Sequence, residues 1–212
     1  MLSQSRIRAV IPSLFLILLA AGPVAAQTSV ALSLYGAFSG ATSGNGVQQS
    51  PSNSAGGMFE LRHISNAIAG WDIAYSYNRA NQVYTYTGPV PAVCPAPPAS
   101  CGVSPAAVSA NAHEITGDWV VSVHVANVRP FALAGVGLLL NEPTGGQTNT
   151  TSSDKPVFVY GAGLDWGVLP HLGLRFQYRG NVYKAPDVTQ AFSSTNAFTH
   201  TAEPMIGAYF SF

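Results

Sequence analysis

The chain has 212 residues, of which only 8% are charged and 47% are hydrophobic, and its formal net charge is zero. Charged residues make up about a quarter of an ordinary soluble domain, so a soluble domain of this composition would be short of charge at its surface. Nucleic acid is not expected as a partner, because a neutral chain offers no basic patch to the phosphates. We expect instead a protein whose outer face meets lipid.

The N-terminal segment has the three parts of a secretory signal peptide. Two arginines precede a short apolar run (14–21), and small residues (24–26) close the segment. This order predicts export and cleavage before Gln27. An uncleaved anchor helix would need roughly 20 apolar residues to cross hydrocarbon, and the run is shorter. The predicted organisation is therefore a signal peptide at 1–26 and a single domain at 27–212.

The rest of the chain repeatedly alternates large apolar residues with small or polar ones, which is the pattern of β-strands. Most of these segments approach the 9–11 residues with which a tilted strand crosses a bilayer. The fifth alternates less regularly, and its inward face is left open. The eight predicted strands lie at 28–38, 59–63, 71–78, 114–124, 129–140, 157–168, 172–180 and 199–212.

The connections between these strands alternate in length. Short and long links in turn are typical of outer-membrane barrels, with periplasmic turns at one end and extracellular loops at the other. The fold class is therefore expected to be all-β: an eight-stranded antiparallel up-and-down transmembrane β-barrel. The short links lie at 64–70, 126–128 and 169–173, and the long polar loops at about 39–56, 79–112, 141–154 and 183–198.

The last strand ends on aromatic residues. Phe210 and Phe212 are expected to face lipid, whereas Tyr209 and Glu203 turn inward. This strand should pair with the first, since no backbone edge can face hydrocarbon. The aromatic ending resembles the signal by which bacterial outer-membrane proteins are read by their assembly machinery.

The segment VYGAGLDWGVLPHLGLRFQYRGNV (159–182) combines a glycine-rich strand, an aspartate near the turn, a short proline turn and Leu-Arg-aromatic alternation. It resembles the penultimate hairpin of the small eight-stranded OmpA-type outer-membrane barrels. The resemblance implies a bacterial outer-membrane location, contact with lipid and lipopolysaccharide, insertion by the barrel-assembly machinery and a monomer. The chain itself is expected to stop at the barrel, without the peptidoglycan-binding domain of longer family members.

Charged residues fall opposite the lipid-facing aromatics, so we expect them to form a charge network inside the barrel. Arg62 and Arg175 are the expected hubs, because a guanidinium group can bridge two carboxylates. Eight strands leave an interior just wide enough for side chains, which favours a polar, plugged lumen over an open diffusion porin. The predicted network comprises Glu60, Arg62, Glu114, Asp118, Asp165, Arg175, Arg179 and Glu203.

A different function is suggested by RHISNA (62–67). This stretch resembles the His-x-Ser-Asn-Ala element of outer-membrane lipid A deacylases, which are also eight-stranded barrels. The resemblance implies Ser65 as nucleophile and His63 as its base, with Asp72 the nearest downstream acid. The Asn-x-Gly-x-Glu expected to follow is absent. A further alternative is a soluble periplasmic lipid-binding barrel, whose interior would be apolar.

The two cysteines, Cys94 and Cys101, lie in the longest predicted loop and are expected to form a disulfide in an oxidising compartment. The five histidines are dispersed without metal-ligand spacing, so neither a metal nor a cofactor is expected. The favoured function is a structural or surface-interaction barrel without catalysis, which contacts an unidentified extracellular ligand through its loops.

Overall fold

The computed structural model describes residues 27–66, 68–88, 105–144 and 149–212. The predicted signal peptide and the predicted disulfide of Cys94 and Cys101 lie outside these ranges. No helix among the described residues is long and apolar enough to cross a membrane. The strands are β1 (Gln27–Ser39), β2 (Thr42–Gly44), β3 (Val47–Pro51), β4 (Ser54–Ile64), β5 (Ala69–Tyr86), β6 (Ala106–Ser122), β7 (Val128–Pro143), β8 (Ser153–Gly167), β9 (Leu172–Lys184) and β10 (Phe198–Ser211).

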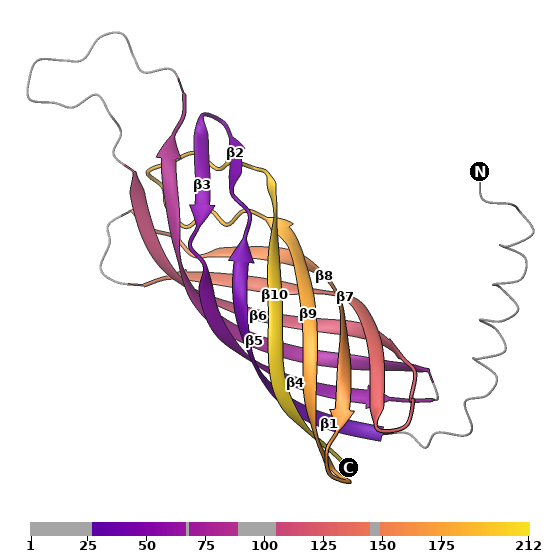
Figure 1. Ribbon diagram of the computed structural model, residues 1–212. Helices are drawn as coiled ribbons and strands as arrows, with labels where there is room; N and C mark the ends of the chain where they lie inside the picture. Colours follow the sequence, from indigo (N-terminus) through magenta and orange to yellow (C-terminus); the bar gives the residue numbers. More distant parts are fainter. Residues whose placement is uncertain (1–26, 67, 89–104, 145–148) are drawn as a thin grey trace, which may run out of the picture.

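Eight strands, β1 and β4 to β10, form a closed antiparallel barrel (Figure 1). Each pairs with its neighbours in the chain, apart from the small hairpin β2–β3, which lies between β1 and β4 in sequence. The last strand β10 pairs with β1, so that Val30 lies opposite Phe210. The predicted fold class and the predicted pairing of first and last strands are both confirmed. Closure leaves no unpaired edge along the wall.

The barrel has two different ends. At the turn end, short turns join β4 to β5, β6 to β7 and β8 to β9, and the C-terminus lies there (Figure 1). At the loop end, β2 and β3 project beyond the wall. We use the names turn end and loop end for these two regions throughout.

The sequence prediction was wrong for part of the loop end. The predicted loop 39–56 contains the hairpin β2–β3, and β3 pairs with β5, which runs on to Tyr86. The turn is Asn45-Gly46, where both residues have positive φ (52° and 74°), as a two-residue hairpin of type I′ requires. These strands carry mostly polar residues, with the buried Val47 as an exception, so they lack the alternation that identified the wall.

Burial is inverted relative to a soluble protein. Leu34 and Trp119 expose 72% and 77% of their surface, whereas the side chains of Arg62, Arg175 and Arg179 are at most 2% exposed. Successive side chains of a strand point to opposite faces, so the polar alternate positions all lie inside. The wall therefore has an apolar outer surface and a charged interior, and an apolar outward band is typical of barrels in the outer membrane.

Candidate functional site: a charged barrel interior

All eight charged residues predicted to line the interior lie there, each with no more than 6% of its surface exposed. They come from β4, β6, β8, β9 and β10, and Asp72 of β5 joins them. The alternation of the sequence places Asp72 on this same face. The structure divides the nine residues into two groups, which we call the central network and the outer network.

The central network is built on Arg62 and Arg175. Arg62 donates from Nε and Nη2 to Asp72 Oδ2, at 2.9 and 2.8 Å. Arg175 donates from Nε and Nη2 to the two oxygens of Asp165, at 2.7 and 2.9 Å. Glu60 lies between the two arginines, 3.3 Å from Arg175 Nη1 and 3.5 Å from Arg62 Nη2. Hydrogen bonds between a guanidinium group and a carboxylate are charge-assisted, and they are among the strongest that side chains form.

Two uncharged side chains complete the central network. Gln177 accepts from Arg62 Nη2 at 3.4 Å and donates to Glu60 Oε1 at 3.3 Å. The guanidinium carbon of Arg62 lies 4.0 Å from the ring centre of Phe131, a cation–π arrangement. Phe131 also settles the inward face of β7, which the sequence left open. The inward residues of this strand include Phe131, Leu133 and Leu139.

The outer network lies one layer closer to the loop end. Arg179 donates from Nη1 to Asp118 Oδ2 at 3.0 Å and from Nη2 to Thr116 Oγ1 at 2.8 Å. Its distance to Glu114 Oε1 is 3.9 Å, too long for a hydrogen bond. Asp118 fits because the residue opposite it on β7 is Gly135, where a Cβ atom would collide with the Asp118 side chain. Within the described ranges, Arg179 is the one arginine that lies within ion-pair distance of Glu114 and Asp118.

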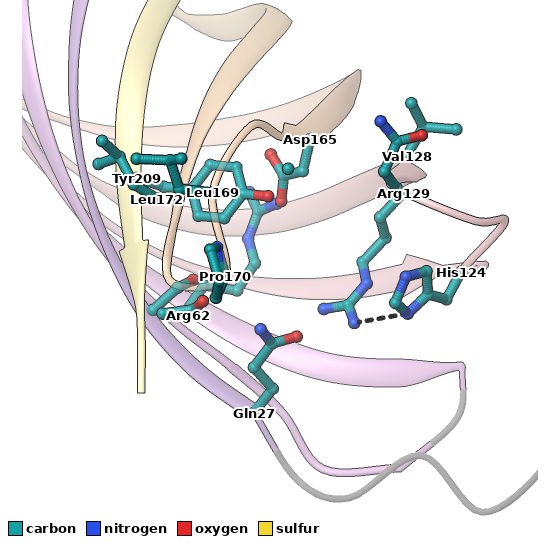
Figure 2. A pocket seen from close by; sticks show the side chains of 14 residues that line it. Gln27, Arg62, His124, Val128, Arg129, Asp165, Leu169, Pro170, Leu172 and Tyr209 are labelled. Carbon is teal, nitrogen blue, oxygen red and sulfur yellow. Dashed lines mark hydrogen bonds and ion pairs between the residues drawn. The ribbon is translucent and has the colours of Figure 1, made fainter.

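At the turn end, a cavity of about 170 Å³ leads to the central network. Figure 2 shows Arg129 extending across this cavity toward His124, with Arg62 and Asp165 also lining it. The Arg129 Nη2 to His124 Nδ1 distance is 3.4 Å. Arg129 is not among the residues predicted from the sequence to lie in the interior. Its even spacing from Phe131 would have placed both residues on one face, had the inward face of this strand been known.

At the loop end, residues 185–195 cross the mouth of the barrel, and we call this segment the cap. Gln49 donates to the carbonyl oxygen of Pro186 at 3.0 Å, and so does the Tyr84 hydroxyl at 3.0 Å. The Tyr84 hydroxyl also accepts from the Val188 amide at 3.3 Å. Val188 is fully buried in an apolar cluster with Tyr84. Burial raises the pKa of Tyr84 to about 12, so its hydroxyl remains a donor at neutral pH.

The residues implied by the deacylase resemblance are not brought together. His63 faces outward, where its Nδ1 lies 2.9 Å from Thr28 Oγ1 and its ring packs against Trp71. Asp72 faces inward and pairs with Arg62. Ser65 is exposed in the turn after β4. His63 and Asp72 therefore lie on opposite faces of the wall, which does not give the acid–base–nucleophile chain of a hydrolase.

No group of three or more His, Cys, Asp or Glu side chains among the described residues is arranged to hold a metal ion. The aromatic residues at the C-terminus face outward: Phe210 exposes 48% and Phe212 66% of its surface. Their rings lie 6.4 Å apart, so they form a small apolar surface at the turn end.

No protein-family model and no curated protein matches the chain. Several solved structures match the chain in fold. OprG of Pseudomonas aeruginosa superposes with a TM-score of 0.62 at 8% identity, covering 91% of this chain and 98% of that one. Ail of Yersinia pestis gives 0.52 at 15% identity (89% and 100%), and neisserial surface protein A gives 0.50 at 14% identity (90% and 99%). The chain therefore has the fold of the small eight-stranded outer-membrane β-barrels.

Proposed function

We propose that the chain is a bacterial outer-membrane protein with a structural or surface-binding role, and that its barrel is closed to solute diffusion. The observation that carries this proposal is the burial of Arg62, Arg175 and Arg179, each at most 2% exposed, across the middle of the interior. The apolar outer wall supports the membrane location. It also argues against a soluble lipid-binding barrel, which would hold its apolar surface inside.

Conductance tests the closed interior. Folded protein reconstituted in planar bilayers is expected to give no stepwise ion current at neutral pH. Asp154→Asn, at an exposed position near the loop end, is the matched control and should behave as the wild type. A steady ohmic conductance of the wild-type protein, comparable to that of a diffusion porin, would contradict the proposal that the interior is closed.

Accessibility on intact cells tests the location and orientation. A protease site inserted between Asn45 and Gly46, in the β2–β3 turn, should be cut by added protease. The same site inserted at Asn127, in the turn between β6 and β7, should be cut only after the outer membrane is opened. Equal cleavage of both sites in intact cells would contradict the proposed orientation.

For the surface partner, we propose recognition by neutral polar groups. One Ail structure was solved in complex with the heparin analogue sucrose octasulfate. The loop end of the present chain has balanced charges, so a sulfated polyanion is not the expected ligand. Weak heparin retention at physiological salt would agree with this proposal, whereas retention that requires high salt would contradict it. The charged residues in question are Arg79, Lys155, Lys184, Glu142, Asp154 and Asp187.

The export and assembly steps belong to the same proposal: signal-peptide cleavage before Gln27, insertion by the barrel-assembly machinery among lipopolysaccharide, and a monomeric state. We also propose the disulfide between Cys94 and Cys101. Intact-mass measurement of the purified protein tests cleavage and the disulfide together. The measured mass should be that of a chain that begins at Gln27. Alkylation without reductant should leave both cysteines unmodified.

A further inference from the structure

The buried charges of the interior do not balance. Among the residues that the structure describes, six carboxylates and three guanidinium groups are buried. An isolated buried charge is strongly unfavourable unless it is paired, neutralised by a proton or bound to a metal. The buried carboxylates are Glu60, Asp72, Glu114, Asp118, Asp165 and Glu203.

The imbalance lies in the outer network. In the central network, three carboxylates are set against Arg62 and Arg175, and Arg129 lies opposite Asp165 in the β7–β8 register. In the outer network, three carboxylates are set against Arg179 alone. Glu203 makes no ion pair within 4.0 Å of any cationic group in the described ranges. With all three carboxylates ionised, the outer network would therefore carry two uncompensated negative charges.

Besides Asp118 Oδ1 and the Arg179 Nε donor, three further side-chain atoms of this layer lack a hydrogen-bond partner in the described part of the chain: Glu114 Oε1, Glu203 Oε2 and Asn181 Oδ1. Each belongs to a side chain at least 95% buried. The Asn181 amide nitrogen donates to Glu114 Oε2 at 2.9 Å. Glu203 lies on β10, the strand that pairs with the strand of Asn181. While the two carboxylates are ionised, all three atoms are acceptors and cannot satisfy one another.

These three side chains line one cavity of about 30 Å³. The cavity lies between the outer network and the loop end, and the hydroxyl-bearing residues Ser76 and Thr201 line it as well. A volume of this size accommodates one ion or about two water molecules. Water could satisfy the three acceptors, but it would leave the two negative charges uncompensated.

We propose that this cavity binds one divalent hard cation through Glu114, Glu203 and Asn181. Carboxylate and amide oxygens are the ligands that Ca²⁺ takes in proteins, and a charge of two balances the outer network. Ser76 and Thr201 supply further oxygen atoms to the same cavity. The cation would stabilise the folded barrel, because it is bound by the folded state alone. This inference goes beyond the proposed surface role and does not depend on it.

The test uses Ca²⁺ as the probe. Wild-type protein is refolded from urea into detergent with Ca²⁺ or with EDTA, separated from free ion, and analysed for bound metal by mass spectrometry. About one Ca²⁺ per chain is expected after refolding in Ca²⁺, with a higher urea midpoint than in EDTA. Glu203→Gln should lose both the bound ion and the shift in midpoint. Glu142→Gln, at an exposed carboxylate near the loop end, should keep both.

A second readout keeps the test decisive if Glu203→Gln folds poorly. Tyr183 lines the same cavity, so Tb³⁺ bound in wild-type protein should be sensitised by tyrosine excitation and displaced by Ca²⁺. The proposal is overturned if wild-type protein retains no Ca²⁺ and shows neither a midpoint shift nor terbium sensitisation; protons or water then satisfy the site. Equal Ca²⁺ retention by Glu203→Gln and wild type would also overturn it, because the ion would then lie elsewhere.

Discussion

The central network and the cap both lie across the interior of the barrel, but different interactions hold them. The central network consists of charged groups at 2.7–3.5 Å on wall strands, and it joins both adjacent strands and strands that lie across the interior from each other. The cap is a segment without a strand that is held mainly by neutral hydrogen bonds and by the burial of Val188. The first cannot rearrange unless the wall does, whereas the second can open by itself.

This difference implies that the two regions respond differently to mutation. Loss of a partner in the central network leaves a charge buried, and such changes are among the most destabilising known. Loss of a neutral hydrogen bond in the cap costs far less. We therefore expect the central network to control stability and conductance, and the cap to control the local dynamics of the loop end.

The largest effect is expected from Arg175→Leu, which removes the closer of the two arginines that Glu60 and Asp165 share and leaves Arg62 at 3.5 Å from each. The free energy of unfolding should fall by about 3–5 kcal/mol, measured by urea titration of the protein in lipid vesicles. Lys155→Leu, which removes the partly exposed pair with Asp187, should cost about 0–1 kcal/mol. If the two variants were equally stable, the central network would not have the role assigned to it.

Leu34→Arg tests the assumption that both regions lie inside a wall that faces lipid. Leu34 lies near the middle of β1 and is 72% exposed. A charge placed at the bilayer midplane should cost about 2–4 kcal/mol. Gln48→Arg, on the exposed face of β3 beyond the wall, should change stability by less than about 0.5 kcal/mol. Similar costs at both positions would mean that the wall does not face hydrocarbon.

Tyr84→Phe tests the contribution of the cap to stability and to closure of the barrel. It removes the hydrogen bonds to Pro186 and Val188 at a cost of about 1 kcal/mol. Amide hydrogen exchange of residues 185–195 should become faster, while bilayers remain without conductance because the central network is intact. Tyr86→Phe, an exposed ring on the same strand, is the control. Conductance of the Tyr84→Phe variant would show that the cap, and not the central network, blocks the passage of ions.

The smallest effect is expected from Ser65→Ala at the turn end. Ser65 is exposed and no hydrogen bond joins its side chain to His63 in the described residues. The change should alter stability by less than about 0.5 kcal/mol, and the lipid A acyl pattern of expressing cells should not change. Loss of lipid A 3-O-deacylation in the variant, with deacylation present in the wild type, would establish the hydrolase alternative.

The sequence predicted the wall well where the two faces of a strand meet different surroundings. On β9, Arg175, Gln177 and Arg179 alternate with aromatic residues, so lipid on one side and charge on the other fix the orientation. On β7 both faces are apolar, since Phe131 and Leu133 point inward while Val136 and Leu138 point outward. Alternation carries no signal there, and only the packing of Phe131 against Arg62 settles the direction.

The sequence also could not predict how the interior residues pair. It placed Arg62, Arg175 and the carboxylates on one face, but which arginine meets which acid depends on strand register and barrel shear. The hairpin β2–β3 was missed although its Asn-Gly turn is a strong local signal. The cap could not be predicted, because its contacts with Gln49 and Tyr84 join segments more than 100 residues apart.

The contact between Glu60 and Arg175 joins residues separated by 115 positions. Around the closed barrel the shorter path from β4 to β9 runs through β1 and β10, so this ion pair forms when the seam between the first and last strands closes. Contacts of such sequence separation form late in folding because a long loop must be ordered first. A late contact acts chiefly on the unfolding rate. The central network should therefore lower the rate at which the seam reopens, and it should leave the rate of insertion almost unchanged.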